Sequence, residues 1–382
     1  MSLPSDMSPL TELGLLKATL ERDEVCLLGL PFDVLNEQGT VDTLNRAVAH
    51  KRPCFLSTPN LNFVIAAVSD PVFRASVSVS DLSVADGMPL IWIAKLLGVP
   101  LSERVAGSSV FERMRQEERA EKARVFFFGG MDSVAEQAVD ALNENSAGML
   151  AVGSLNPGFG SVEDMSTGSI IDQINDAKPD FLVVSLGAKK GQSWITANRH
   201  KLNAPVVSHL GAVVNFVAGT VERAPRMWQK LGLEWVWRIV EEPTLWKRYF
   251  LDGIALLRLM LTRVVPLAVY DRKMAKQNRE LSLSIKLVEC NGKNTLILFG
   301  AAKRKELIAL KSKLPSLLQS ERILEIDLSD LEYADASFWA LMLRLQTEVT
   351  KRKSTLSIVG VHPVLQKLLR LNMLDEVLHT SP

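Results

Sequence analysis

Short apolar runs alternate with helix-like segments along the first part of the chain. The runs predict strands at residues 25–30, 53–56, 82–85, 124–128, 149–153, 180–186 and 205–210. Helical periodicity predicts helices at residues 42–50, 62–68, 71–77, 88–97, 133–143, 170–176 and 192–201. Strands that alternate with helices in this way predict a doubly wound, mostly parallel α/β sheet of Rossmann-like type, with helices on both faces.

A second α/β pattern begins near residue 283. Its predicted strands are residues 295–299, 323–328 and 355–361, and its predicted helices are residues 303–318, 337–351 and 363–371. A segment of about a hundred residues has a usual domain size. We therefore expect four parts: an N-terminal extension (1–24), a large domain (25–220), a basic amphipathic appendage or linker (221–282) and a smaller α/β domain (283–382).

The expected appendage is basic and rich in tryptophan. Residues 223–279 hold twelve Lys or Arg, five Asp or Glu and four of the seven tryptophans. Residues 254–270 are very apolar but include Arg258 and Arg263, so they are too short and too charged to predict a transmembrane helix. An amphipathic segment lying on a membrane surface fits this pattern. A helical hairpin packed on the sheet explains it as well, because tryptophan also fills protein cores.

The totals limit the partners and the location. A net charge of +1 over 382 residues argues against nucleic acid as a partner. The three cysteines, Cys26, Cys54 and Cys290, are far apart and lack metal-binding spacing, which predicts a reducing compartment and no structural zinc. The start of the chain lacks the pattern of a signal peptide, so we expect a cytoplasmic location.

Polar and small residues follow several predicted strands, at the edge where open α/β sheets bind ligands. Thr58, Asp86, Gly129 and Gly187 all fall at such strand ends. Asp86 stands before Gly87, where a carboxylate can act as a general base, although Asp-Gly is also a common turn pair. Gly129-Gly130 precedes a helix and can hold a phosphate on backbone N–H groups, or can simply form a tight turn.

Other motifs leave more than one reading open. The loop Leu186–Gln192 contains Lys189 and Lys190, which suit a diphosphate but also fit a solvated turn. His209 ends an apolar strand and can line a pocket or lie in the core. The chain has no Asp-x-Asp, HExxH, GxxxxGK[ST] or Gly-x-Ser-x-Gly motif, so a metal enzyme or a serine hydrolase has little support.

Taken in order, these segments resemble the WecG/TagA/CpsF family of glycosyltransferases over residues 25–253. The motifs that carry the resemblance are Thr58-Pro59-Asn60, Asp86-Gly87, Glu103-Arg104-Val105-Ala106-Gly107, Phe128-Gly129-Gly130, Leu186-Gly187-Ala188, Gly211-Ala212, Phe216-Val217-Ala218-Gly219, Arg223-Ala224-Pro225, Leu231-Gly232-Leu233-Glu234-Trp235 and Glu242-Pro243.

The resemblance implies an inverting, metal-independent transferase. It would move a sugar from a UDP-sugar donor to a polyprenyl-diphosphate-linked saccharide at the inner face of the plasma membrane, in exopolysaccharide or cell-surface glycan synthesis. Asp86 falls on the family's proposed base, and Arg238 and Arg248 match basic positions of its appendage. The other substrate-binding positions that we expect are Thr58, Asn60, Arg104, Gly129, Gly130, Gly187, Lys190, Gln192, Asn215 and Arg223.

The chain also departs from the family pattern. A Pro-Lys-Gln-Glu run appears here as Lys189–Gln192, and Asn215 stands where many members have aspartate. These changes leave the donor sugar open. A non-catalytic protein that binds nucleotide sugars and regulates through its C-terminal domain is the alternative. A nucleotide-dependent oxidoreductase is indicated only by the sheet pattern, and its glycine fingerprint is missing.

The C-terminal domain resembles a STAS domain, on the segments Ile326–Ser329, Asp335–Ser337 and Leu356–Val361. The regulatory members have a phosphorylatable serine where this chain has Ala336. For the neighbouring Ser337 we expect a helix N-cap role. The resemblance implies a module that binds a protein partner, and self-association of the chain is left open.

Overall fold

The computed structural model describes residues 12–378 except 223, 226, 229–231, 291 and 321. Contacts within the chain divide it into two units. The large unit spans Val34–Met260, and the small unit joins the described residues up to Asp33 with those from Leu261 onward. The sequence pattern predicts boundaries at 24/25, 220/221 and 282/283, so the observed division differs at both ends of the large unit.

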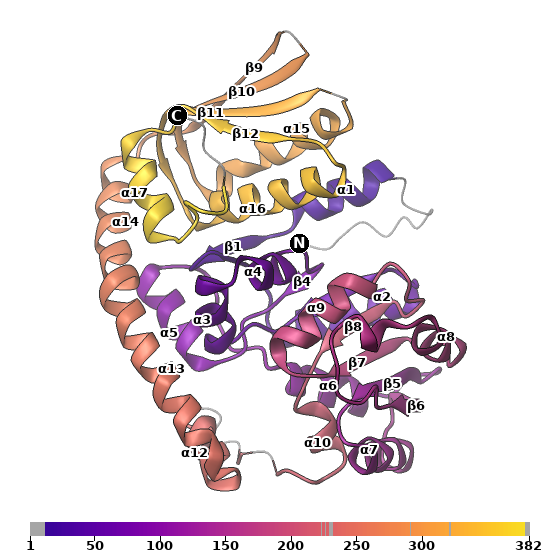
Figure 1. Cartoon of the computed structure of the whole chain (residues 1–382). Coiled ribbons are helices and arrows are strands. Elements are labelled where there is room, and N and C mark those ends of the chain that lie inside the picture. Colours follow the sequence, from indigo (N-terminus) through magenta and orange to yellow (C-terminus); the bar gives the residue numbers. More distant parts are fainter. Residues whose placement is uncertain are drawn as a thin grey trace. The chain divides into compact units, whose positions relative to one another are not determined.

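A six-stranded parallel sheet forms the centre of the large unit, in the order β4-β3-β8-β7-β5-β6 (Figure 1). Its strands are β3 (Cys54–Ser57), β4 (Leu82–Ser83), β5 (Ala123–Gly129), β6 (Met149–Leu155), β7 (Phe181–Ser185) and β8 (Val206–His209). The predicted doubly wound sheet is therefore confirmed.

Alternating side chains explain why these strands are apolar throughout. Phe127 of β5 packs in one core cluster, whereas Phe126 and Phe128 pack in the cluster on the opposite face. In β7, Val183 faces the first cluster, and both its neighbours in the chain face the second. Because side chains alternate with a period of two, a parallel strand covered by helices on both faces has no polar face.

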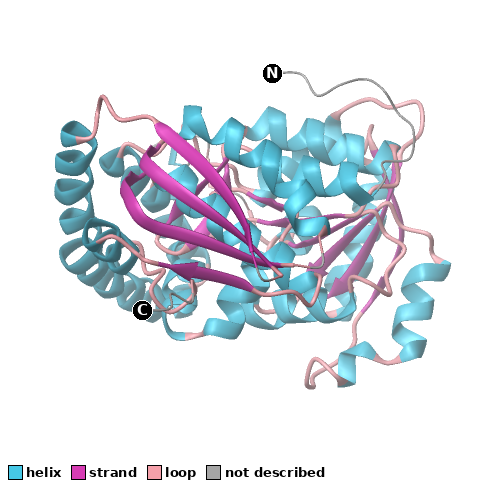
Figure 2. Ribbon diagram, turned by 90° about the horizontal axis from the view of Figure 1, so that it is seen from above, coloured by secondary structure: helices cyan, strands magenta, loops and turns pink. Residues whose placement is uncertain are grey.

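The helices of the large unit cover both faces of the sheet, as Figures 1 and 2 show, and continue into the appendage. They are α2 (Glu37–Ala49), α3 (Leu61–Ser69), α4 (Pro71–Ser78), α5 (Met88–Leu97), α6 (Gly107–Gln116), α7 (Asp132–Glu144), η1 (Asp164–Ser166), α8 (Gly168–Asp176), α9 (Ala188–Asn198), α10 (Val213–Val217), α12 (Glu234–Glu241), η2 (Pro243–Leu245) and α13 (Trp246–Leu259). The helices predicted above do not include α6, although Val110, Phe111 and Met114 form its buried face.

The small unit contains a four-stranded sheet in the order β12-β11-β10-β9. Its strands are β9 (Leu283–Cys290), β10 (Lys293–Ala302), β11 (Ile323–Ala334) and β12 (Leu356–Val359). Strand β9 pairs antiparallel with β10, and the other two pairs are parallel. The helical elements are α1 (Glu12–Glu21), a π-helical turn at Met260–Val264, α14 (Val265–Gln277), η4 (Arg304–Glu306), α15 (Leu307–Gln319), α16 (Ala336–Lys351) and α17 (Pro363–Leu371).

The N-terminal segment does not contribute to the parallel sheet. Where the sequence pattern predicts one strand at 25–30, the structure has two short antiparallel strands, β1 (Glu24–Leu27) and β2 (Leu30–Asp33). They reverse at Leu28 and Gly29, both with positive φ, as a tight two-residue hairpin turn requires. Both strands contact α16 of the small unit. A leucine in this conformation is uncommon, so the sequence carries no clear turn signal.

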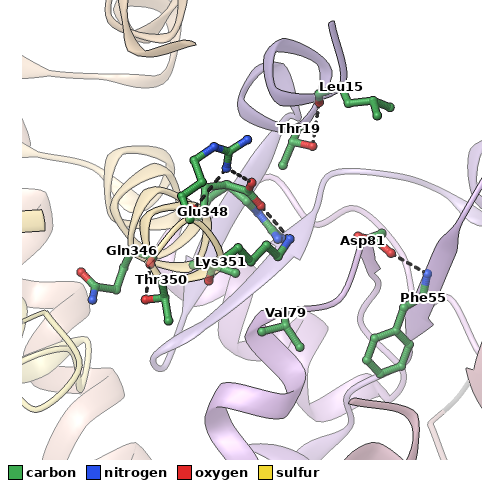
Figure 3. Close-up of polar contacts among 12 residues, drawn as sticks. Leu15, Thr19, Phe55, Val79, Asp81, Gln346, Glu348, Thr350 and Lys351 are labelled. Carbon is green, nitrogen blue, oxygen red and sulfur yellow. Dashed lines mark hydrogen bonds and ion pairs between the residues drawn. The ribbon is translucent and has the colours of Figure 1, made fainter. Parts of the chain in front are cut away.

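Charged side chains join this hairpin to the rest of the small unit. The Arg344 guanidinium on α16 lies 2.6 Å from the carboxylate of Glu24, and both side chains are at most 5% exposed. Arg22 also pairs with Glu24 and with Asp33. Figure 3 shows further polar contacts on α1 and α16. On α1 the Thr19 hydroxyl donates to the Leu15 carbonyl, and on α16 Lys351 pairs with Glu348.

The start of α16 corrects one prediction. Asp335, and not Ser337, is the N-cap, because its carboxylate accepts the N–H groups of Ser337 and Phe338 at 2.9 and 3.1 Å. The helix begins one residue earlier than the pattern predicts, which places Ser337 inside the first turn, 6% exposed. Aspartate at an N-cap is as favourable as serine.

Candidate active site

Three loops of the large unit meet beyond the carboxyl ends of β3 and β4. Backbone bonds hold them together: Val84 N–H donates to the Ser57 carbonyl, Asp86 N–H to the Pro59 carbonyl, and Val105 N–H to the Ala85 carbonyl, all at 2.9–3.0 Å. The loop that carries Asp86 is therefore bonded on one side to the Thr58 loop and on the other to the Arg104 loop. The motifs that the sequence separates by up to about fifty residues form one structure.

The Asp86 carboxylate is held from two directions. Arg104 donates from Nε to Oδ1 of Asp86 at 3.1 Å, and the backbone N–H of Gly107, the first residue of α6, also stabilises its charged form. A helix N-terminus favours negative charge at this place. The side chain remains 26% exposed, so a substrate hydroxyl can reach it.

Gly107 lets α6 begin close to neighbouring side chains. A Cβ at this position would lie 2.4 Å from the Leu210 side chain and 3.2 Å from that of Thr58, so these side chains would have to shift. The absence of a side chain at 107 thus accommodates the start of α6, whose N–H stabilises the charged form of Asp86. Thr58 lies beneath this contact and is 8% exposed.

Glu234, at the start of α12, completes an acidic–basic–acidic set with Arg104 between two carboxylates. The guanidinium Nη1 of Arg104 lies 2.5 Å from Oε2 of Glu234. The sequence motif Leu-Gly-Leu-Glu-Trp contains Glu234, but the sequence analysis assigns it no role in the site. Its available signal is that it is one of the few acidic residues in a basic segment.

Burial and charge act on Asp86 in opposite senses. Burial raises the pKa of Asp86, and Arg104 and the Gly107 N–H oppose this rise, whereas the Glu234 carboxylate adds to it. The net result is a pKa above the ordinary aspartate value. For Arg104, the two carboxylates outweigh burial and raise its pKa, so it stays charged. A carboxylate with raised basicity beside a fixed cation suits general-base chemistry.

Asn60 fixes the start of α3 through a hydrogen bond to the backbone. Its side-chain oxygen accepts the N–H of Phe63 at 3.2 Å, which makes it the N-cap of α3. Gly87 lies next to it, with φ at +131°, and a Cβ there would be 3.8 Å from the Asn60 Cβ. The structure therefore brings Thr58, Asn60, Asp86 and Arg104 together.

The predicted glycines and the predicted lysine lie at or after the carboxyl ends of β5 and β7, on the same edge of the sheet as Asp86. Gly129 has φ at +93°, and a Cβ there would meet the Ser185 carbonyl at 2.8 Å, so a tight turn at the end of β5 explains this glycine. Gly130 lies beside Val214, and Gly187 caps α9 with open space around it. The Lys190 amine donates to the Gly160 carbonyl at 2.8 Å.

Gln192 and Gly191 make buried contacts with residues next to the site. Gln192 is fully buried and donates to the Ser57 hydroxyl at 2.9 Å, one residue before Thr58. A Cβ at Gly191 would lie 2.2 Å from the His209 ring, so this ring requires glycine at 191. His209 donates from Nε2 to the Leu186 carbonyl at 2.6 Å, and burial lowers its pKa, so it is a neutral core histidine.

The basic residues of the appendage lie on α12 and α13. The Arg238 guanidinium lies 5.9 Å from the centroid of the Phe216 ring, and its Nε is buried without a hydrogen bond to any described residue. Arg248 is about half exposed and lies 3.9 Å from Asp252, whose carboxylate accepts a bond from Asn62 of α3. Asn215 lies on α10 and is partly buried. Arg223 is outside the described residues.

A cavity of about 460 Å³ opens beside this region. It lies between α6 and α10 and is lined by Phe111, Val213, Phe216 and Glu222, among others. Of these residues, Phe216 belongs to one of the family motifs, and none is expected from the sequence to bind substrate. The Phe216 ring lines the cavity and also contacts the Arg238 guanidinium, so the cavity borders the appendage.

One helical stretch among the described residues, Pro243–Gln277, is long and apolar enough to cross a membrane by length and composition alone. Its first part, α13, exposes Trp246, Phe250, Ile254 and Leu257 by 52–61%. No group of three histidine, cysteine, aspartate or glutamate side chains gathers as metal ligands would in the part of the chain that the structure describes.

Comparisons with known protein families match two separate parts of the chain. A family model described as "Glycosyl transferase WecG/TagA/CpsF family" matches residues 25–268, and a STAS domain model matches residues 290–379. Among solved structures, a mutant of arylmalonate decarboxylase matches half of the chain with 18% identity and a TM-score of 0.19, too little for any argument.

Three curated relatives share the name N-acetylglucosaminyldiphosphoundecaprenol N-acetyl-beta-D-mannosaminyltransferase. The Bacillus spizizenii protein is 29% identical over 51% of this chain and 74% of its own length. The Bacillus subtilis protein is 27% identical over 57% of this chain and 84% of its own length. The Staphylococcus aureus protein is 24% identical over 68% of this chain and 94% of its own length.

Proposed function

Because this chain belongs to the WecG/TagA/CpsF family of glycosyltransferases, we propose that it transfers a sugar from a UDP-sugar to a saccharide carried on polyprenyl diphosphate, with inversion and without a metal cofactor. The relatives' names indicate an N-acetylglucosamine-bearing lipid diphosphate as the acceptor. The donor sugar is part of the proposal, and UDP-N-acetylmannosamine is the first to test.

The observation that carries the proposal is the setting of Asp86. Its backbone is bonded to two neighbouring loops, its carboxylate is partly exposed, and its pKa is raised by burial. In the proposed reaction the acceptor hydroxyl oxygen attacks the anomeric carbon and passes its proton to Asp86. The bond from that carbon to the UDP oxygen breaks, and UDP leaves with the electron pair. A single in-line displacement inverts the anomeric centre.

Arg104 and Glu234 are proposed as positioning residues. Arg104 is charged and pinned between two carboxylates, so it orients Asp86 without being able to accept a proton. The negative charge of Glu234 offsets part of the effect of Arg104 and raises the pKa of Asp86. Since Glu234 lies on α12, the start of the appendage takes part in setting the chemistry.

The leaving diphosphate needs positive charge, which we assign to the appendage. Arg238 has a buried Nε without a hydrogen bond to a described residue, and Arg248 is half exposed on the next helix. Arginine side chains bind phosphate oxygens through paired N–H groups, and such fixed donors can stabilise a departing diphosphate.

We further propose that the protein attaches peripherally to the inner face of the plasma membrane and that α13 supplies the contact. We also propose that the STAS domain binds a protein partner.

The first prediction tests the base. With a panel of UDP-sugars and a lipid-diphosphate N-acetylglucosamine acceptor, we expect UDP release and a longer lipid-linked saccharide for at least one donor, unchanged by a chelator. Asp86→Asn should lower kcat/KM by about 10²–10⁴-fold, because general-base catalysis contributes about that much. UDP binding should persist. The matched control is Asp140→Asn, an exposed carboxylate on α7.

Two results would contradict the proposal. Full activity of Asp86→Asn would remove Asp86 as the base. UDP binding with no turnover of any donor would favour the alternative of a non-catalytic regulator.

A further inference from the structure

A second cavity, of about 380 Å³, lies in the small unit between α14 and α17. The two helices contact each other and run side by side in Figure 1. Residues of α14 and the turn before it line most of the cavity, and Lys367 lines it from α17. We call this cavity the α14–α17 groove. Nothing in the proposed transfer reaction uses it.

One wall of the groove is an exposed apolar stripe. Leu261, Val265 and Val269 follow one another at four-residue spacing, so they share one face of the helix. Their exposed fractions are 65%, 43% and 65%. Single exposed apolar residues are ordinary, but a continuous apolar face beside a cavity marks a binding surface.

The other wall carries positive charge. The Lys367 amine lies 4.2 Å from the centroid of the Tyr270 ring, and Lys273 lies about one turn beyond Val269. Both lysines are exposed, and no acidic side chain lines the groove. Contact with the aromatic face holds the Lys367 charge at the groove while leaving its amine hydrogens for a ligand. A matching ligand is apolar at one end and anionic at the other.

The helix itself indicates which amphiphile this is. The stretch Pro243–Gln277 has the length and hydropathy of a membrane helix, and only 22% of its most apolar window is buried. The apolar stripe of the groove belongs to that stretch. A phospholipid supplies both an acyl chain for the stripe and a phosphate for two lysines, and a cytoplasmic leaflet is rich in anionic lipid.

We propose that the α14–α17 groove binds one anionic phospholipid, with an acyl chain along Leu261, Val265 and Val269 and the phosphate between Lys273 and Lys367. The inference rests on the proposed attachment to a membrane, since that is where the lipid is met. It adds that the STAS-containing unit has a lipid site of its own, with one lysine from α17.

The experiment uses the full-length protein and short-chain lipids below their micelle concentration, so that no membrane is needed. Calorimetric titration with dioctanoyl phosphatidylglycerol should give saturable binding to one site, and dioctanoyl phosphatidylcholine should bind several-fold more weakly. Lys273→Gln and Lys367→Gln should each weaken phosphatidylglycerol binding about fivefold. Lys367→Arg should restore it, because the charge is kept.

Matched controls separate the groove from general surface effects. Val269→Gln should weaken binding, whereas Ile308→Gln should not, although Ile308 on α15 is at least as exposed, at 72% against 65% for Val269. Lys313→Gln on α15 is the corresponding charge control.

The outcomes are distinct from those of the proposed function. Equal binding by groove and control variants would overturn the lipid site, as would the absence of any phosphatidylglycerol binding, even while transferase activity and vesicle binding persist. Binding of free inorganic phosphate as tight as that of the lipid would also overturn it, since the apolar wall would then contribute nothing. Saturable binding of an acidic peptide without lipid binding would assign the groove to a protein partner.

Discussion

Single residues carry the chemistry of this protein, and their environment changes what their sequence context indicates. Asp86 followed by glycine is a common turn pair, but here its backbone is bonded to Pro59 and its carboxylate to Arg104. Gly191 departs from the family pattern, and the His209 ring explains why no side chain fits there. Local sequence cannot report either contact, because both partners are distant along the chain.

The residue-scale prediction concerns Glu234 and pH. Glu234→Gln removes a negative charge that raises the pKa of Asp86 and leaves Arg104 with Asp86 alone. Activity requires the charged base and falls as pH drops through its pKa. The acidic limb of the kcat/KM profile should therefore move to lower pH, and the plateau should fall about tenfold because a weaker base transfers the proton more slowly.

Two variants make this prediction specific. Glu234→Asp keeps the charge and should leave the limb near its wild-type position. Glu241→Gln, on the exposed part of the same helix, should change neither the limb nor the plateau. An acidic limb that stays in place in Glu234→Gln would exclude coupling through Arg104.

Among the secondary-structure elements, α13 shows how a pattern with two interpretations is resolved. The tryptophan-rich basic segment predicts either a membrane-surface helix or a hairpin packed on the sheet. The structure shows that α13 contacts α3 and yet leaves Trp246, Phe250, Ile254 and Leu257 more than half exposed. A hairpin buried on the sheet would cover these side chains, so the exposed face supports the membrane-surface interpretation.

We predict that α13 drives vesicle binding. Trp246→Gln with Phe250→Gln should weaken co-sedimentation with anionic vesicles by about tenfold or more, because each aromatic side chain loses roughly 1.5–3 kcal/mol of burial. Binding should also weaken with salt, since Lys247 and Arg248 are exposed beside them. Val72→Gln, 77% exposed on α4, is the control. Unchanged binding by a truncation ending near Gly219 would refute the role of α13.

At the scale of the whole molecule, the N-terminal segment belongs to the unit at the other end of the chain. Strand β1 contacts α16, and Glu24 pairs with Arg344, 320 residues away. Burial raises the pKa of Glu24, but Arg22 and Arg344 outweigh it and hold the pKa below the ordinary value. The small unit thus includes a segment that precedes the large unit in the sequence.

We predict that Glu24→Gln destabilises the small unit by about 3–5 kcal/mol, because it leaves Arg344 buried without its charged partner. Hydrogen exchange of α16 amides should speed up accordingly. A carboxylate with a lowered pKa contributes stability that is complete above the ordinary glutamate pKa and is lost as pH falls below it. The wild-type α16 should therefore lose protection in acid, and Glu24→Gln should show less of this loss. Glu21→Gln, in an exposed i,i+4 pair, should change little, and an equal effect in both variants would contradict the prediction.

The amino-acid sequence by itself determined the alternation of strands and helices, the parallel sheet, and the residues at its strand ends. These properties follow from side-chain period and turn chemistry, which act over a few neighbouring residues. The β1–β2 hairpin and the N-cap at Asp335 escaped it, because their local signals are ambiguous: the turn has a leucine at positive φ, and both Asp335 and Ser337 can cap a helix. Only the tertiary structure decided that Glu234 meets Arg104 across 130 positions, that His209 requires Gly191, and that Glu24 meets Arg344. Such contacts depend on how elements that are far apart in the sequence pack together, and a local sequence pattern carries no information about this packing.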